Sequence, residues 1–117
     1  MTTEQDCIFC KIVAGAIPAK LIFEDDAAVA FRDINPQAPT HALVIPRKHI
    51  ASLAEAGETD AALLGHLLLV AARVAREEGH AEGGYRTVIN TGSGAGQTVF
   101  HIHVHVLAGR SLTWPPG

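Results

Sequence analysis

The chain contains three histidines at strict two-residue spacing, in the run His-Ile-His-Val-His-Val at residues 101–106. Successive side chains of a β-strand point to opposite faces of its sheet. The alternation therefore predicts a strand with one polar and one apolar face. The polar face carries His101, His103 and His105, and the apolar face carries Phe100, Ile102, Val104 and Val106.

The spacing limits what these histidines do together. A strand rises about 3.3 Å per residue, so His101 and His105 would stand roughly 13 Å apart, too far to ligate one metal ion. One or two of them can still ligate a metal, since His-x-His is also a zinc-binding pattern. Imidazole also acts as a nucleophile or as a general acid or base near neutral pH. Both readings stay open from the spacing alone.

Length and charge bound the class of protein. The 117 residues predict a single domain over residues 1–117, with 48% hydrophobic and 18% charged residues. The net charge is −3 and no Lys/Arg cluster occurs, so we expect no nucleic-acid and no membrane partner. The polar start MTTEQD does not resemble a signal peptide. We expect a soluble cytoplasmic protein.

Hydrophobic periodicity and turn residues predict the elements. A short helix is expected over residues 7–14, and a long helix from Thr59 or Asp60 to Glu78. Strands are expected over residues 21–24, 28–32, 41–45, 85–90 and 98–107. This order indicates an α+β fold with one meandering antiparallel sheet of about five strands.

The long helix has two adjacent apolar stripes, which make its apolar face wide for a helix that only covers a sheet. One stripe is Leu63, Leu67, Val70 and Val74, and the other is Leu64, Leu68, Ala71 and Ala75. Both stripes suit a core, and the extra width is compatible with a second copy of the chain.

A glycine-rich loop, Gly92 to Gln97, leads directly into the histidine run. Glycines let backbone N–H groups approach an anion closely, and such loops bind phosphate. Gln97 and Thr98 add side-chain donors. Donors for phosphate oxygens followed by a neutral imidazole favour nucleophilic attack at phosphorus.

Other polar residues suit the same site. His41 and His49 flank one expected strand, and Asp33 and Asn90 each end another, where a turn or capping role is the plainer reading. The Cys7-x-x-Cys10 pair suggests a metal site or a redox motif in a reduced compartment.

With these features the chain resembles the histidine triad family. Its run His101-Ile-His-Val-His-Val-Leu matches the signature of alternating histidines and hydrophobic residues that names the family. Similar segments cover nearly the whole chain from Cys7, and the ending Trp114-Pro-Pro-Gly117 is similar to the Hint branch. The resemblance implies the family's fold, with sheets joined across a homodimer.

The resemblance also implies roles for single residues. His103 matches the nucleophile that attacks the α-phosphorus, His105 the residue that contacts phosphate and assists the leaving group, and His101 a supporting residue. His41 matches a supporting histidine behind the nucleophile. Further positions match nucleotide contacts: Asp33 and Ile34 for ribose and base, and Asn90, Gly96, Gln97 and Thr98 for phosphate and ribose. Thr98 stands where serine is frequent.

The resemblance to the Hint branch implies the activity of a purine nucleoside phosphoramidase. Such enzymes hydrolyse the P–N bond of adenosine or guanosine 5′-phosphoramidates through a nucleotidyl-histidine. That catalysis requires no metal. Two other functions remain: a purine-nucleotide-binding regulatory or scaffold protein with weak catalysis, and a dinucleoside polyphosphate hydrolase. The Hint-like ending argues against the last.

Some bacterial members of the family have a structural zinc site with a similar cysteine pair. The matching residues are Cys7, Cys10, His49 and His101, a Cys₂His₂ set of the kind that binds zinc tetrahedrally. The alternative is a pair of buried thiols.

Overall fold

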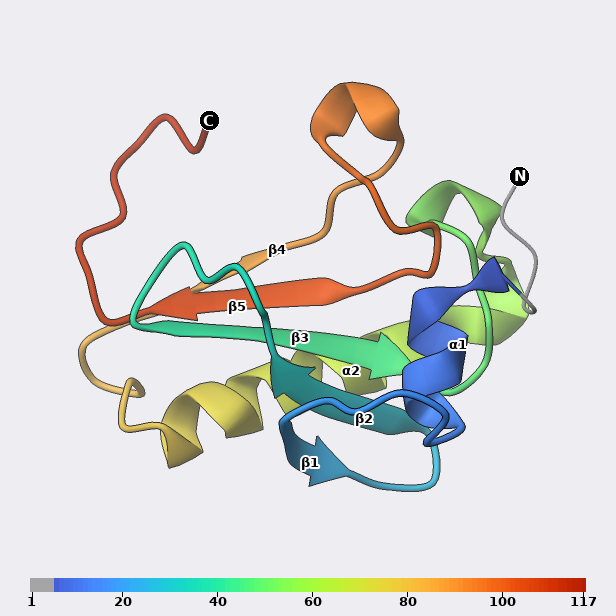
Figure 1. Ribbon diagram of the computed structural model, residues 1–117. Helices are drawn as coiled ribbons and strands as arrows, with labels where there is room; N and C mark the ends of the chain where they lie inside the picture. The colour runs from blue at the N-terminus through green and yellow to red at the C-terminus, as the bar shows by residue number, and fades with distance from the viewer. Residues whose placement is uncertain (1–5) are drawn as a thin grey trace.

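The computed structural model describes residues 6–117, in which one antiparallel sheet lies between two helices (Figure 1). The five strands are ordered β1-β2-β3-β5-β4. Elements in chain order are α1 (Ile8–Val13), β1 (Leu21–Glu24), β2 (Ala28–Arg32), β3 (Thr40–Pro46), α2 (Ala61–Glu77), β4 (Arg86–Val88) and β5 (Val104–Ala108). The predicted α+β class is confirmed. The order departs from a simple meander only because β5 lies between β3 and β4.

Alternation along the strands divides the core into two clusters, one on each face of the sheet. In β2, Ala28 and Ala30 belong to the cluster beneath α2, whereas Val29 and Phe31 belong to the cluster that includes Phe9 of α1. Small residues face the long helix because its own valines and leucines fill that space. The histidine site develops on the α1 side.

The β1–β2 hairpin has the predicted bounds. Its turn is fixed by Asp25, whose carboxylate accepts backbone hydrogen bonds from Ala27 and Ala28 at 2.9 and 2.7 Å. These bonds lower the pKa of Asp25 despite the opposing effect of desolvation.

Helix α2 follows the prediction closely, with Asp60 at its N-cap position. The Asp60 carboxylate does not cap the helix. It accepts instead from the Gly57 backbone N–H and from Lys48, at 2.9 and 2.7 Å. The buried residues of α2 come from both predicted stripes, while Leu68 and Leu69 are 46% and 71% exposed. The buried residues are Leu67, Val70 and Val74 of one stripe and Ala71 and Ala75 of the other.

The expected strand over residues 98–107 is wrong at its beginning, because β5 starts only at Val104. The register pairs Val44 with Val104, so the position opposite Ile102 is Pro46. Proline has no N–H to donate to a ladder. The Ile102 N–H donates instead to the carbonyl oxygen of Ile50, at 2.7 Å. His101 and His103 therefore lie in the irregular segment before β5.

Strand β4 is also shorter than the expected 85–90, since only Arg86–Val88 pair with β5. Within residues 6–117, no helix has both the length and the apolar character needed to cross a membrane.

Candidate active site

A pocket of about 300 Å³ opens beside His103 and His105. Its walls are largely apolar, and its polar side chains include Asp33 and Thr98. The apolar wall includes Ile8, Phe9, Ile12, Phe31, Ile34 and Val99. Small-molecule sites commonly combine such apolar walls with a few polar groups.

The hydrogen bond of His103 fixes its tautomer. Its Nδ1 lies 2.8 Å from the backbone carbonyl oxygen of His101. A carbonyl oxygen only accepts hydrogen bonds, so Nδ1 carries the proton and Nε2 keeps its lone pair. Burial lowers the pKa of His103, which favours this neutral form. A buried neutral imidazole with a bare Nε2 beside a pocket is arranged as a nucleophile.

The tautomer of His105 is fixed through His41. The Gln37 backbone N–H donates to His41 Nδ1 at 3.0 Å, so a neutral His41 carries its proton on Nε2. That Nε2 lies 2.9 Å from His105 Nδ1. His105 therefore accepts at Nδ1 and carries its own proton on Nε2. The two neighbouring histidines thus have opposite tautomers, one with a lone pair at Nε2 and one with a proton there.

His103 and His105 lie next to each other, with ring centroids 5.0 Å apart. Burial lowers the pKa of His105 to about 4, with a contribution from His103 and His41, because a second positive charge nearby would be repelled. With this low pKa, His105 is a neutral hydrogen-bond donor near pH 7.

Asp33 completes this group from the end of β2. Its Oδ2 lies 3.3 Å from His41 Nε2, and its Oδ1 accepts from the Asn35 backbone N–H at 2.8 Å. The sequence predicted His41 as support for the nucleophile. The structure instead pairs His41 with His105, so its direct support goes to the third histidine.

The Gln97 side chain bonds to backbone groups of the protein itself. Both of its amide hydrogens are used on backbone carbonyl oxygens, Ala51 at 2.8 Å and Val99 at 3.1 Å. Its oxygen accepts from the Gly92 N–H at 2.8 Å, and the residue is buried. Gln97 therefore holds the glycine-rich loop in place, and its contact with a nucleotide stays a prediction.

The other predicted contact residues differ in whether they line the pocket. Ile34 and Thr98 line the pocket. Gly96, in the left-handed conformation at φ 95°, turns the chain after the 3₁₀ turn Ser93–Ala95, and its N–H donates to Ser93. Asn90 lies partly buried after β4 and is outside the described lining of the pocket. Contact of Gly96 and Asn90 with a nucleotide stays a prediction.

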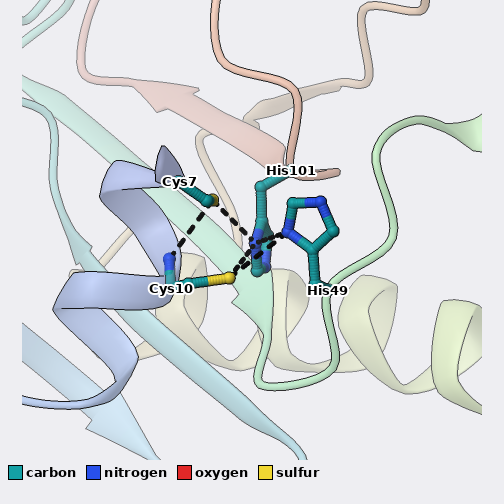
Figure 2. A group of neighbouring side chains, drawn as sticks. All are labelled: Cys7, Cys10, His49 and His101. Carbon is teal, nitrogen blue, oxygen red and sulfur yellow. Dashed lines mark hydrogen bonds between the residues drawn. The ribbon is translucent and has the colours of Figure 1, made fainter. Parts of the chain in front are cut away.

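A second group lies on the other side of His101, where Cys7, Cys10 and His49 converge on its ring (Figure 2). His101 Nδ1 lies 3.3 Å from Cys7 Sγ, 3.5 Å from Cys10 Sγ and 3.2 Å from His49 Nδ1. Cys10 Sγ lies 3.3 Å from His49 Nδ1. The four residues predicted as metal ligands are thus brought together.

The donor geometry fits a tetrahedral metal. Zinc bonds of about 2.3 Å to sulfur and about 2.0 Å to nitrogen place the ligand atoms of a tetrahedral site roughly 3.3–3.8 Å apart. The separations above lie in or next to that range. His101 Nε2 donates to the carbonyl oxygen of Pro46 at 2.8 Å, which leaves Nδ1 bare for a ligand. Burial lowers the pKa of His101 to about 4, which also favours the bare form.

Comparison with known proteins agrees with this geometry. The HIT domain model matches residues 14–112. The chain belongs to the HIT family. It is 58% identical over 113 residues to an uncharacterized HIT-like protein of Synechococcus elongatus, covering 97% of this chain and 98% of the relative.

Solved structures of other HIT proteins superpose closely on this one. A HIT family hydrolase from Legionella pneumophila is 55% identical with a TM-score of 0.93, covering 95% of this chain and 99% of the other. A HIT family hydrolase from Clostridium thermocellum is 44% identical with a TM-score of 0.92, covering 95% and 96%. This HIT protein therefore has the fold of HIT family hydrolases.

Sequence reasoning missed one residue of the site. Phe9 of α1 lies edge-on to both His101 and His103, with ring centroids 5.9 and 5.1 Å apart. Its position between the two cysteines of Cys7-x-x-Cys10 was the available signal, since any group that orders those cysteines also orders Phe9.

Proposed function

We propose that this HIT protein hydrolyses purine nucleoside 5′-phosphoramidates through attack of His103 on the α-phosphorus. The observation that carries the proposal is the pair of opposite tautomers at His103 and His105. One residue offers a lone pair and its neighbour offers a proton to the same pocket. The similarity to HIT family hydrolases supports the reaction class.

Two steps account for the reaction. His103 Nε2 forms a bond to phosphorus while the P–N bond breaks, and the departing amine nitrogen gains a proton. Water then attacks phosphorus and gives a proton to the now neutral His105, the bond to His103 breaks, and the nucleoside monophosphate leaves. An amine leaves readily only when it is protonated, so a proton source beside the nucleophile is needed. His105 supplies it in the imidazolium form, which a bound anionic phosphoryl group favours by raising the pKa of His105.

The pocket suits a nucleoside attached to that phosphorus. Its apolar wall, with Phe9, Phe31 and Ile34, offers surfaces on which a purine ring stacks. Asp33 stands at the edge of this wall, where its carboxylate can accept hydrogen bonds from ribose hydroxyls. An apolar wall accepts adenine and guanine alike, so we expect turnover of both nucleosides.

The test is an assay of adenosine and guanosine phosphoramidates, with mass spectrometry of the stopped reaction. We expect release of AMP or GMP and a nucleotidyl adduct on His103. His103→Ala should lose turnover while keeping its circular dichroism spectrum and thermal unfolding. Tight AMP binding with a rate near that of the uncatalysed reaction would instead favour a regulatory nucleotide-binding protein.

We also propose a structural zinc ion at Cys7, Cys10, His49 and His101. When bound, zinc would hold α1 against the segment before β5 and take no part in hydrolysis. Neither Cys7 nor Cys10 is in a disulfide within residues 6–117. Metal analysis of purified protein tests this: stoichiometric zinc supports the site, and substoichiometric zinc with two titratable thiols removes it.

A homodimer is the third part of the proposal. The exposed Leu68 and Leu69 on α2 support it, because neighbouring large apolar side chains on a surface helix commonly mark an interface. The double variant Leu68→Lys and Leu69→Lys should sediment as a monomer. Leu21→Lys, at an exposed leucine of β1, is the matched control and should sediment as wild type does.

A further inference from the structure

The four residues Cys7, Cys10, His49 and His101, here called the Cys/His group, are not independent of the proposed nucleophile His103. The group and the nucleophile are linked by His101, which is fully buried and held at both ring nitrogens, Nε2 by the Pro46 carbonyl and Nδ1 by the Cys/His group. The backbone carbonyl of the same residue accepts the hydrogen bond from His103 Nδ1. Whatever fixes the His101 ring therefore also fixes the acceptor that orients the nucleophile.

A second connection runs through Phe9. The ring of Phe9 meets the ring of His103 edge-on, at an interplanar angle of 87°, and also meets Phe31 with centroids 5.4 Å apart. Its helix, α1, has only six residues. Helices this short are unstable unless tertiary contacts hold them. Cys7 caps α1 by accepting the Cys10 N–H, and the sulfurs of both cysteines point into the Cys/His group (Figure 2).

We propose that Phe9 and His101 are positioning residues through which metal occupancy of the Cys/His group sets the rate at which His103 is nucleotidylated. This inference rests on the proposed function and adds regulation to it. The ion stays outside the reaction. It acts by holding His101 and Phe9, which both contact the nucleophile.

We expect a large effect of metal binding on the rate of His103 adduct formation, although the metal does not contact His103. Displacing a reacting group by about 1 Å lowers rates by as much as 10²-fold. Losing the partners that orient a ligand typically lowers affinity or activity by about 10–100-fold. We therefore expect removal of the metal to reduce the rate of adduct formation at saturating substrate by roughly 10–100-fold. The affinity for AMP should change much less, because Phe31, Asp33 and Ile34 of the pocket wall lie outside α1 and outside the segment before β5.

The experiment compares two variants with matched controls. His49→Gln removes one ligand without altering a residue that contacts His103, and His66→Gln removes a histidine outside both groups. Phe9→Leu removes the ring edge but leaves every ligand in place, and Phe23→Leu makes the same change on β1. Four quantities are measured for each: metal per chain, the rate constant of His103 adduct formation, the AMP dissociation constant, and the ¹⁵N NMR signals of the His103 ring.

We expect His49→Gln to lose metal, to form the adduct slowly, and to show mixed tautomers at His103. Phe9→Leu should keep its metal yet also form the adduct slowly, and both controls should resemble wild type. The proposal is overturned if His49→Gln loses metal with unchanged His103 signals and unchanged rate, or if Phe9→Leu behaves as Phe23→Leu does. A wild-type protein without metal also overturns it.

The coupling can still be tested if His49→Gln does not fold or if the wild-type protein forms no adduct. If His49→Gln does not fold, wild-type protein treated with a chelator takes its place, and Phe9→Leu provides a test that leaves the ligands intact. If wild-type protein forms no adduct, the proposed function fails, and the ¹⁵N signals of His103 with and without metal still decide the coupling.

Discussion

The side-chain amide of Gln97 donates to the carbonyl oxygen of Ala51 across 2.8 Å, which joins the glycine-rich loop to the segment after β3. The same amide closes the loop on itself through Gly92 and binds the carbonyl oxygen of Val99. Since Val99 lines the pocket and the histidines follow directly, Gln97 connects loop geometry to the site.

Gln97→Ala should destabilise the protein. It leaves a partly buried N–H at Gly92 and two carbonyl oxygens without their partner, and unsatisfied groups of this kind cost about 1–3 kcal/mol. Urea unfolding measures the change. Gln37→Ala is the control, because Gln37 is exposed and its side-chain amide donates to the carbonyl oxygen of Asn35, which is also exposed. Equal stability of the two variants would contradict the role assigned to Gln97.

The sequence predicted those helices and strands whose positions depend on neighbouring residues in the chain. The hairpin β1–β2 lies where two short apolar runs flank Asp25-Asp26, and helix α2 lies where 3.6-residue periodicity places it. The start of β5 was not predictable in this way. It depends on Pro46, more than fifty residues earlier in the chain, which occupies the position where a ladder donor would be needed.

The candidate site also has parts that the sequence predicted and contacts that it could not predict. Residue types at fixed spacing predicted the Cys/His group, because metal ligands are few in kind and the family resemblance supplied the remote partners. The amide of Gln97 was assigned to a phosphate because its polarity is visible in the sequence and its partners are not. Ala51 and Val99 bind through backbone oxygens, which every residue has, so no side-chain pattern marks them.

The stability of the protein should fall as the pH drops from about 6.5 towards 4, in part through His105. The folded protein keeps this residue neutral down to about pH 4, whereas the unfolded chain protonates it near the ordinary histidine pKa of about 6.5. The unfolded state therefore binds more protons within this window, which favours unfolding. His105→Asn should show a flatter curve of unfolding free energy against pH. Parallel curves for variant and wild type would contradict this.

Gly109→Ala should destabilise the protein more than Gly84→Ala. Both glycines have a positive φ, 95° and 100°, where a side chain costs roughly 1–2 kcal/mol. Only at Gly109 would the added Cβ also lie 2.8 Å from Pro39, in the loop that leads into β3. Thermal unfolding of the two variants isolates the contact from the backbone strain. Equal losses would show that the Pro39 loop moves aside freely.

His41 should matter for turnover through the tautomer of His105. His41→Leu removes the donor that keeps the His105 proton on Nε2, so the proton can move to Nδ1 and away from the pocket. Orienting partners of this kind are worth about 10–100-fold in activity, and we expect kcat to fall by that factor with AMP affinity nearly unchanged. His41→Gln keeps an N–H donor near the same place and should retain more activity than the leucine variant. If glutamine and leucine are equally slow, the bond to His105 does not act through its donor. If both are as fast as wild type, His105 is oriented by other groups, and ¹⁵N signals of its ring would then show the proton on Nε2 in all three proteins.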